Sequence, residues 1–307
     1  MTFLQVKRPD DSCCSSVACG GSSWAMDNAD TLEQIKYCQK LWAESHAIPY
    51  DNANGRVPNL DDNLFASLDA ETASEFGNAD GSELGRNGKP GKMFSLHSSS
   101  ALVCNVFDHW RRRPLAPLLQ ACGIEGNRND LWFEQKFPTG LGGTPPNLDV
   151  VLSCDGKSPV TAIESKFTEP YSSGDHTGFS DSYFRDEELW EGLEKCRGLA
   201  ENFARANFRY LDAAQLLKHA LGLHRAFTAG GFELLYLWYD VPGSSAAETL
   251  REEVERFSQA VSTEVRFRSL TYQELFGRLA PVVGETDYAA YLGSRYFPDL
   301  SNAASKN

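Results

Sequence analysis

Two apolar runs joined by a very short link constrain the fold of this chain more than any other feature. NLDVVLS (147–153) and VTAIESKF (160–167) have the length and the apolar, β-branched residues of strands. The link between them, CDGKSP, is rich in residues that favour turns. A short link of this kind is typical of two antiparallel strands, so the sequence predicts a hairpin over 147–167.

The segments around the hairpin alternate between helical and strand patterns. A helix is expected over 95–114, where Leu102, Val106 and Trp110 form one stripe, and a strand over 131–137. After the hairpin we expect helices at 192–206 and 210–227, a strand at 232–243, a helix at 246–261, a strand at 263–270 and a helix at 271–280 capped by Thr271. This order predicts an α/β fold with a mixed sheet and helices on both of its faces.

The N-terminal third has a different composition and divides the chain. Residues 1–30 are rich in Ser, Gly, Cys and Asp without periodicity, which predicts a flexible arm. Residues 31–94 combine one helical pattern, at 30–45, with loop-like stretches full of turn residues from about 47 to 92. We therefore expect an arm, a helical and loop-rich extension over 31–94, and the α/β domain over 95–300.

Charge and hydropathy restrict the classes of function. The chain has no apolar run of 18 residues and no basic-then-apolar N-terminal pattern, so we expect a soluble, cytoplasmic protein without a membrane partner. Its net charge of −13 argues against nucleic-acid binding over the whole surface but allows a local basic groove. The eight cysteines form no CxxC pair, which favours free thiols over a zinc site built from Cys13, Cys14 and Cys19.

Three charged residues stand out on the predicted hairpin. Glu164 and Lys166 are two residues apart on one strand and therefore share a face, and Asp149 lies on the partner strand. A carboxylate in an apolar strand is costly unless a cation pairs with it. The three side chains therefore indicate either a half-buried ion-pair network or one wall of an active site. Signatures of other enzymes, namely G-x-S-x-G, a P-loop, GxGxxG after a strand and HExxH, do not occur.

Asp149 together with Glu164-x-Lys166 resembles the motif of the PD-(D/E)XK, or restriction-endonuclease-like, nucleases. The proline of the strict motif is absent, because Leu148 precedes Asp149. GSEL (81–84), GKMFSLHSSSALVCNVFDHW, QLLKHALGL, LLYLWYDVPG and TYQEL, taken with the hairpin, are also similar to a little-characterised subfamily of these proteins. The resemblance extends over about residues 80–280.

The resemblance implies a restriction-endonuclease-like core and a metal-dependent nuclease. Asp149 and Glu164 would bind Mg²⁺ or Mn²⁺ with the carbonyl of Ser165 as a third ligand, and Lys166 would orient the attacking water or stabilise the transition state. The charges agree, because two neighbouring carboxylates repel each other unless a divalent cation lies between them. The substrate would be nucleic acid, with DNA favoured over RNA and the choice between them left open.

Several further residues are candidates for the same site. Gln215 and His219, spaced i and i+4, resemble a Gln-x-x-x-Tyr element of some of these nucleases, with His in place of Tyr. Glu83 and Glu134 are rival candidates for an upstream acid ligand, and each is equally compatible with an exposed carboxylate. Lys136, Lys157 and the cluster Arg111–Arg113 would favour nucleic acid if they lined one groove.

Two other functional classes are compatible with these observations. The first is a non-catalytic protein that uses the same fold to bind nucleic acid or to act as a scaffold. The second is a metal-dependent hydrolase of a phosphate ester that is not a polymer, which would need no basic groove. The sequence leaves open the sequence specificity, endonuclease or exonuclease action, and the oligomeric state, a homodimer included.

Overall fold

A mixed sheet forms the centre of the computed structural model, which describes residues 28–78, 83–86, 88–143, 145–172, 176, 178–227 and 230–298. Its five strands lie in chain order: β3 (Asp130–Lys136), β4 (Asn147–Cys154), β5 (Lys157–Lys166), β6 (Phe232–Trp238) and β7 (Phe267–Thr271). β3, β4 and β5 pair antiparallel, whereas β5, β6 and β7 pair parallel. The predicted hairpin and the mixed sheet are both confirmed. A small second sheet pairs β1 (Gly85–Arg86) with β2 (Lys89–Pro90).

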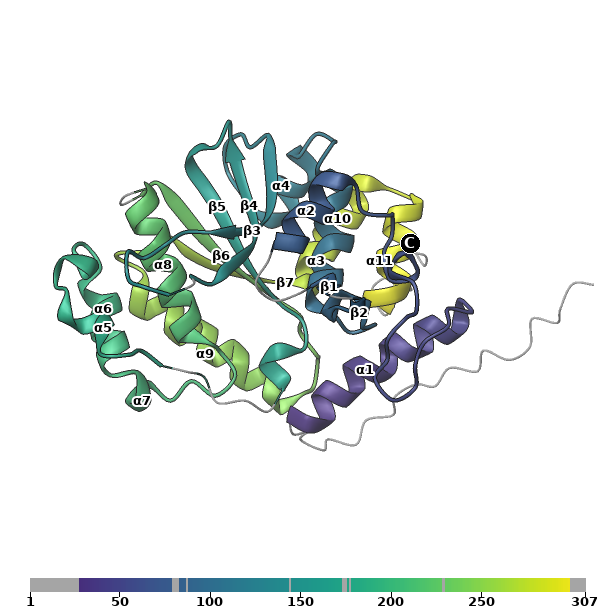
Figure 1. Cartoon of the computed structure of the whole chain (residues 1–307), viewed down its shortest axis with the longest axis horizontal. Coiled ribbons are helices and arrows are strands. Elements are labelled where there is room, and N and C mark those ends of the chain that lie inside the picture. Colours follow the sequence, from purple (N-terminus) through teal and green to yellow (C-terminus); the bar gives the residue numbers. More distant parts are fainter. Residues whose placement is uncertain are drawn as a thin grey trace, which may run out of the picture.

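Helices cover both faces of the large sheet, as Figure 1 shows. On one face, α8 (Ala213–Phe227) contacts β5 and β6, and α9 (Ser245–Val261) contacts β7. On the other face, α3 (Ser99–Phe107) contacts β4 and β5, and α10 (Tyr272–Val283) packs beside α4 (Ala116–Cys122). The remaining helices are α1 (Asn28–Ser45), α2 (Ala70–Asn78), α5 (Ser182–Arg185), α6 (Glu194–Glu201), α7 (Phe203–Ala206) and α11 (Asp287–Tyr296). Short 3₁₀ turns are η1 (Leu60–Asn63), η2 (Lys92–Phe94), η3 (Asp108–Trp110), η4 (Glu169–Tyr171) and η5 (Glu188–Trp190).

The helix expected over 95–114 is shorter in the structure. The side chain of Ser98 accepts a hydrogen bond from the backbone N–H of Ala101, and this N-cap makes α3 begin at Ser99. α3 ends at Phe107 and passes into η3, and α4 follows after Pro114. The segment at 192–206 is likewise two short helices, α6 and α7, separated at Asn202. The cap at Thr271 is confirmed, because Thr271 and Glu274 form a reciprocal capping box at the start of α10.

The extension and the sheet share one hydrophobic core. Ile35 of α1, Phe76 of α2 and Met93 of η2 are buried in the same cluster as Val150 and Ile163 of the central hairpin. α2 lies in a stretch that was expected to be loop. Its buried Phe76 packs against Phe133 of β3 in a tilted arrangement, with ring centroids 5.0 Å apart. Residues from the N-terminal part of the chain are thereby held against the sheet.

Two expectations concern residues that the structure describes only in part. Residues 1–27 of the expected arm, with Cys13, Cys14 and Cys19, lie outside the described residues. In the described part, Cys38, Cys104, Cys122, Cys154 and Cys196 form no disulfide. None of the described helices combines the length and the apolar character needed to cross a bilayer.

Candidate active site

The candidate site lies where β4 and β5 separate. Their antiparallel register ends at the pair Val150–Ile163, beyond which β4 continues to pair with β3 and β5 with β6. Asp149 stands next to this last pair, and its Oδ2 accepts a hydrogen bond of 2.6 Å from the backbone N–H of Ser165. The side chain of Asp149 therefore reaches across the gap to the strand that carries Glu164 and Lys166.

The backbone of Ser165 also faces this gap. In an extended strand the N–H and the C=O of one residue point to the same side. The carbonyl of the next residue, Lys166, accepts from Tyr239 on the β6 side, so that of Ser165 points toward β4 and Asp149. The hydroxyl of Ser165 lies on the opposite face of the sheet, 2.6 Å from the hydroxyl of Tyr272. Only the main chain of Ser165 is thus available to the site.

Glu164 and Lys166 share the face of β5 that packs on α8, as their spacing predicts. The Nζ of Lys166 lies 2.6 Å from Oε1 of Glu164 and donates to Oε1 of Gln215 at 2.9 Å. The Nε2 of His219 lies 2.9 Å from the other oxygen of Glu164. Gln215 and His219 are one turn apart on α8, so a single helix face holds both members of the Glu164–Lys166 pair.

A polar cavity of about 530 Å³ opens onto these side chains. Asp149, Glu164, Lys166 and Gln215 line it, whereas His219 lies behind Glu164 and is buried. Glu83 and Glu134 line the same cavity. The structure therefore brings every acid that was considered as a metal ligand to one place, and neither Glu83 nor Glu134 is a freely exposed surface carboxylate.

The two upstream acids are held in different ways. Glu83 is 7% exposed and accepts hydrogen bonds from Ser100 at 2.5 Å and from Lys92 at 3.3 Å. Glu134 lies on β3 between residues that pair with Val150 and Leu148, which places it beside Asp149. Its φ of 54° interrupts the regular strand, and its Oε2 accepts from Asn147 at 2.7 Å. The sequence around Glu134 does not show that it reaches the site. Its position depends on an irregular backbone conformation in β3, which is decided by the packing of the sheet.

The crowded acids differ in their pKa values. Burial, followed by the charges of Glu164 and Glu134, raises the pKa of Asp149 well above its usual value. Burial and the neighbouring Glu83 and Glu164 raise the pKa of Glu134 to about 7, against the hydrogen bond from Asn147. Burial would also raise the pKa of Glu164, but Lys166 and His219 lower it to about 2. Of these three acids, only Glu164 has a lysine within ion-pair distance among the described residues, and this lysine favours its ionised form.

The donor atoms of the cavity suit a hard divalent cation. Carboxylate and carbonyl oxygens are the ligands that Mg²⁺ and Mn²⁺ prefer, and the raised pKa of Asp149 shows that its ionised form lacks a compensating cation. As they stand, no three Asp, Glu, His or Cys side chains of the described residues converge closely enough to form a complete ion site. Asp149, Glu164 and the main chain of Ser165 all line the cavity and carry oxygen donors of this kind.

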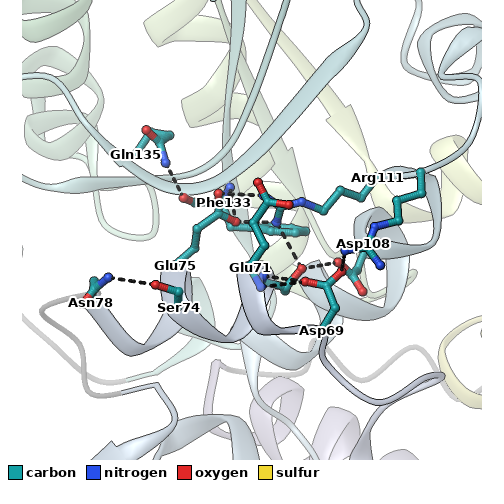
Figure 2. Close-up of polar contacts among 11 residues, drawn as sticks. Asp69, Glu71, Ser74, Glu75, Asn78, Asp108, Arg111, Phe133 and Gln135 are labelled. Atoms are coloured by element: carbon teal, nitrogen blue, oxygen red, sulfur yellow. Dashed lines mark hydrogen bonds and ion pairs between the residues drawn. The ribbon is translucent and has the colours of Figure 1, made fainter.

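The basic residues expected to form a groove are not at this cavity. Arg111 is buried against Glu71 and Glu75 of α2, with a contact of 2.5 Å to Glu75, and Figure 2 shows this cluster beside Phe133. Arg112 pairs with Asp69, and Lys157 begins β5 at the end opposite to Lys166. Lys136, Lys157 and the arginines at 111–113 therefore do not supply a basic groove at this cavity. Besides Lys166, the cavity is lined by the basic side chains of Arg56 and Lys92 of the extension, which the sequence reasoning missed.

Lys92 had one sequence signal. It lies in GKPGKM, a Gly- and Lys-rich stretch that fails as a P-loop because the spacing and the following Ser or Thr are absent. In the structure this stretch leads into η2, next to Ser98, Ser99 and Ser100 at the start of α3, which also line the cavity. Arg56 had no signal, because it lies in a loop distant in sequence from the hairpin.

Comparison with known proteins identifies the family. A protein family described as "Restriction Endonuclease associating with ARP" matches residues 38–297, which is most of the chain and includes the extension as well as the sheet. No curated protein and no solved structure matches the chain. The resemblance to restriction-endonuclease-like proteins is thereby confirmed, and the chain belongs to the restriction-endonuclease family that associates with ARP.

Proposed function

We propose that this protein is a Mg²⁺- or Mn²⁺-dependent nuclease that hydrolyses phosphodiester bonds, with DNA as its substrate. The observation that carries the proposal is the position of Asp149. Its carboxylate has no compensating cation, and it reaches across the gap between β4 and β5 to the backbone N–H of Ser165, next to Glu164 and Lys166. The family supports a nucleic-acid substrate, and its description as a restriction endonuclease favours DNA.

Each side chain of the site has a chemical role in this proposal. Asp149, Glu164 and the carbonyl of Ser165 would hold the cation, with Glu134 or Glu83 as a further oxygen ligand. A divalent cation supplies a Lewis acid that activates water and neutralises charge on the scissile phosphate. Glu164 and Gln215 fix the Lys166 ammonium, whose pKa burial would lower but Glu164 raises, so that it stays charged and can stabilise the transition state.

Gln215 acts as a positioning residue. Its Oε1 accepts from Lys166 and its backbone N–H is capped by Asp212 at 2.9 Å, so the first turn of α8 sets the direction of the ammonium. The same contact keeps Lys166 over the cavity rather than in solvent, because the lysine side chain is 15% exposed.

A nucleic-acid polymer fits the cavity better than a small phosphate ester. Arg56 and Lys92 of the extension line the cavity together with the N-terminus of α3. Cationic side chains and a helix N-terminus both attract phosphate groups. A strand whose scissile phosphate lies at Asp149 and Glu164 would thereby have a neighbouring phosphate at these groups.

The test compares wild-type protein with Lys166→Ala on plasmid, linear and single-stranded DNA and on RNA, in Mg²⁺, Mn²⁺ or EDTA. We expect DNA cleavage only with metal, and a loss of about 100-fold or more in the variant, because removing one transition-state donor costs about 10²–10³ in rate. Lys157→Ala, at the far exposed end of β5, is the matched control and should cleave like wild type. Folded wild-type protein that leaves every substrate intact in both metals would reject the nuclease and favour a non-catalytic role for the same fold.

A further inference from the structure

A second cavity adjoins the candidate active site. It has a volume of about 250 Å³ and shares Lys166, Glu169 and Gln215 with the larger cavity. Its other walls are Pro170, Ser172, His176, Tyr210, Asp212 and Tyr236. A group bound here would therefore lie directly beside the lysine of the proposed reaction, separated from the acids by the Lys166 side chain.

Tyr236 in this cavity carries an unused hydrogen-bond donor. It pairs with Glu164 in the parallel register of β5 and β6 and is 1% exposed. Its hydroxyl has no hydrogen-bond partner among the described residues. Burial, followed by the charge of Glu164, raises the pKa of this phenol well above its usual value, so it keeps its proton at neutral pH. Leaving a buried donor unpaired is costly, which indicates that something outside the protein chain satisfies it.

The charged walls limit what that partner is. The carboxylate of Glu169 is fixed by the N–H groups of Phe167 and Thr168 at 2.9 and 3.0 Å, and that of Asp212 by the N–H of Gln215. The one ammonium on the wall, that of Lys166, already donates to Glu164 and Gln215. The two fixed carboxylates therefore disfavour a phosphate or any other anion, but they accept hydrogen bonds from N–H groups. The cavity therefore suits a neutral ligand that both donates and accepts.

The uncharged walls suit a flat ligand. The rings of Tyr210 and Tyr236 are both almost fully buried, and Pro170 adds a further apolar surface. An apolar wall of this kind suits the ring of a base, whose edge is read through hydrogen bonds. A volume near 250 Å³ is below the ~300–1,000 Å³ of ordinary ligand pockets, so it accommodates one ring system rather than a whole nucleotide.

We propose that this second cavity accepts one unstacked base of the DNA substrate, next to the phosphate at Asp149, Glu164 and Lys166, with Tyr236 donating a hydrogen bond to that base. The inference rests on the proposed nuclease function and adds a specificity-determining site to it. Tyr236 sets which base is accepted at this position, and Asp212 and Glu169 accept from the N–H groups of its edge.

The experiment measures Kd for single-stranded DNA oligonucleotides in which one abasic nucleotide is moved along the sequence. The protein is the full chain with Asp149→Asn, a residue of the first cavity alone, so that the DNA stays intact. We expect one position at which loss of the base weakens binding about threefold to tenfold, as for one hydrogen bond. Tyr236→Phe should weaken binding of the intact strand by a similar factor and leave binding of that abasic strand unchanged.

Two further variants make the test specific. Tyr37→Phe removes a hydroxyl from an exposed tyrosine of α1 and should leave every Kd unchanged. Ser172→Phe places a ring at the wall of the second cavity and should exclude the base. It should therefore weaken binding of the intact strand by the same factor as removal of the base at the identified position. If intact strands bind and neither the abasic scan nor Tyr236→Phe changes Kd, the cavity holds only water and the inference is wrong, while the nuclease proposal stands. If no oligonucleotide binds, both are wrong.

Discussion

At the scale of single residues, the site is set by which carboxylates have a cation beside them. Lys166 and His219 both contact Glu164. Within the part of the chain that the structure describes, no Lys, Arg or His lies within ion-pair distance of Asp149 or Glu134. Asp149 and Glu134 are therefore the acids whose ionised forms have no cation to stabilise them, and a bound cation would have its largest effect on these two.

Glu134→Gln tests this charge balance without metal. The pKa of Glu134 is about 7 in the folded protein against 4.5 for the ordinary side chain, so between these values the folded state binds more protons than the unfolded state. The free energy of unfolding then falls as the pH rises through this window. We expect a fall of about 2 kcal/mol, less than the full pKa shift would give, because the group is partly solvated. Urea unfolding in EDTA from pH 4.5 to 7.5 should show this fall in wild type and a smaller one in Glu134→Gln. Exposed Glu125→Gln should follow wild type, and parallel curves for all three proteins would contradict the raised pKa.

Asp149→Asn should have opposite effects with and without metal. In EDTA at pH 8 it removes a buried carboxyl group whose ionised form lacks a compensating cation, while its amide oxygen can still accept from Ser165, so Tm should rise. A cation bound only by the folded state adds about 2.7 kcal/mol at a hundredfold excess over its Kd. Thermal unfolding with and without Mg²⁺ should therefore show a metal-induced rise in wild type and in exposed Asp61→Asn, but none in Asp149→Asn. An equal rise in all three proteins would place the cation elsewhere.

At the scale of elements, the position of α8 decides the geometry around Glu164 and Lys166. Gln215 and His219 reach Lys166 and Glu164 only if α8 packs closely against the sheet. Gly222, two turns after Gln215, lies against the backbone carbonyl of Phe137 at the end of β3, where no Cβ would fit. The close approach of α8 to the sheet thus depends on this glycine.

Gly222→Ala should displace α8 and weaken both folding and catalysis. We expect a loss of about 1–3 kcal/mol, since overpacking of a tight contact has this cost. DNA cleavage should fall with it because the Lys166–Gln215 contact is disturbed. Gly198→Ala in α6, where an added Cβ meets nothing within 4 Å, is the matched control and should gain up to about 1 kcal/mol. Chemical unfolding and cleavage rates check both variants, and a fully active and stable Gly222→Ala protein would refute this account of α8.

At the scale of the whole molecule, one buried arginine links the extension to the C-terminal helix. Arg295 of α11 is 1% exposed and donates to the backbone carbonyls of Asn63 and Leu96 at 2.8 and 3.1 Å. It also donates to Gln39 of α1, and its guanidinium lies 4.3 Å from the ring centroid of Trp42. The extension that supplies Arg56, Lys92 and Glu83 to the cavity is thus held in place from the other end of the chain.

Arg295→Met should destabilise the protein strongly. The substitution leaves the carbonyl of Asn63 and other buried acceptors without their donor, and loss of one partner from such a buried charged network costs about 3–5 kcal/mol. Arg278→Met, at an exposed position of α10, should change stability by less than about 0.5 kcal/mol. Thermal and urea unfolding of the full chain provide the comparison, and similar stabilities would show that Arg295 is not the link.

The charge distribution predicts a localised salt effect on DNA binding. Arg56→Ala with Lys92→Ala should weaken DNA binding and lower the slope of log K against log salt by about 2, one for each phosphate contact. Arg86→Ala with Lys89→Ala alters the nearby β1–β2 hairpin, whose side chains are exposed and do not line the cavity, and should leave the slope unchanged. Binding titrations at several salt concentrations distinguish the pairs, and equal slopes would remove the extension from the DNA interface.

The sequence by itself determined the hairpin, the mixed sheet and the shared face of Glu164 and Lys166. These features depend on local rules, because strand alternation and a short turn fix which residues face the same way. The same rules placed Gln215 and His219 on one side of α8 and Thr271 at the start of α10. They also identified Asp149, since a carboxylate in an apolar strand is unusual wherever that strand lies.

Only the tertiary structure decided how the cavity is completed. Arg56, Lys92 and Glu83 come from a segment without periodicity, and Glu134 reaches the site through an irregular point in β3. The arginines at 111–113 were considered for the site but do not line it. Arg111 pairs with the acids of α2, and Arg112 pairs with Asp69 just before that helix. Contacts between segments far apart in the chain depend on packing of the whole core, and no spacing within one segment encodes them.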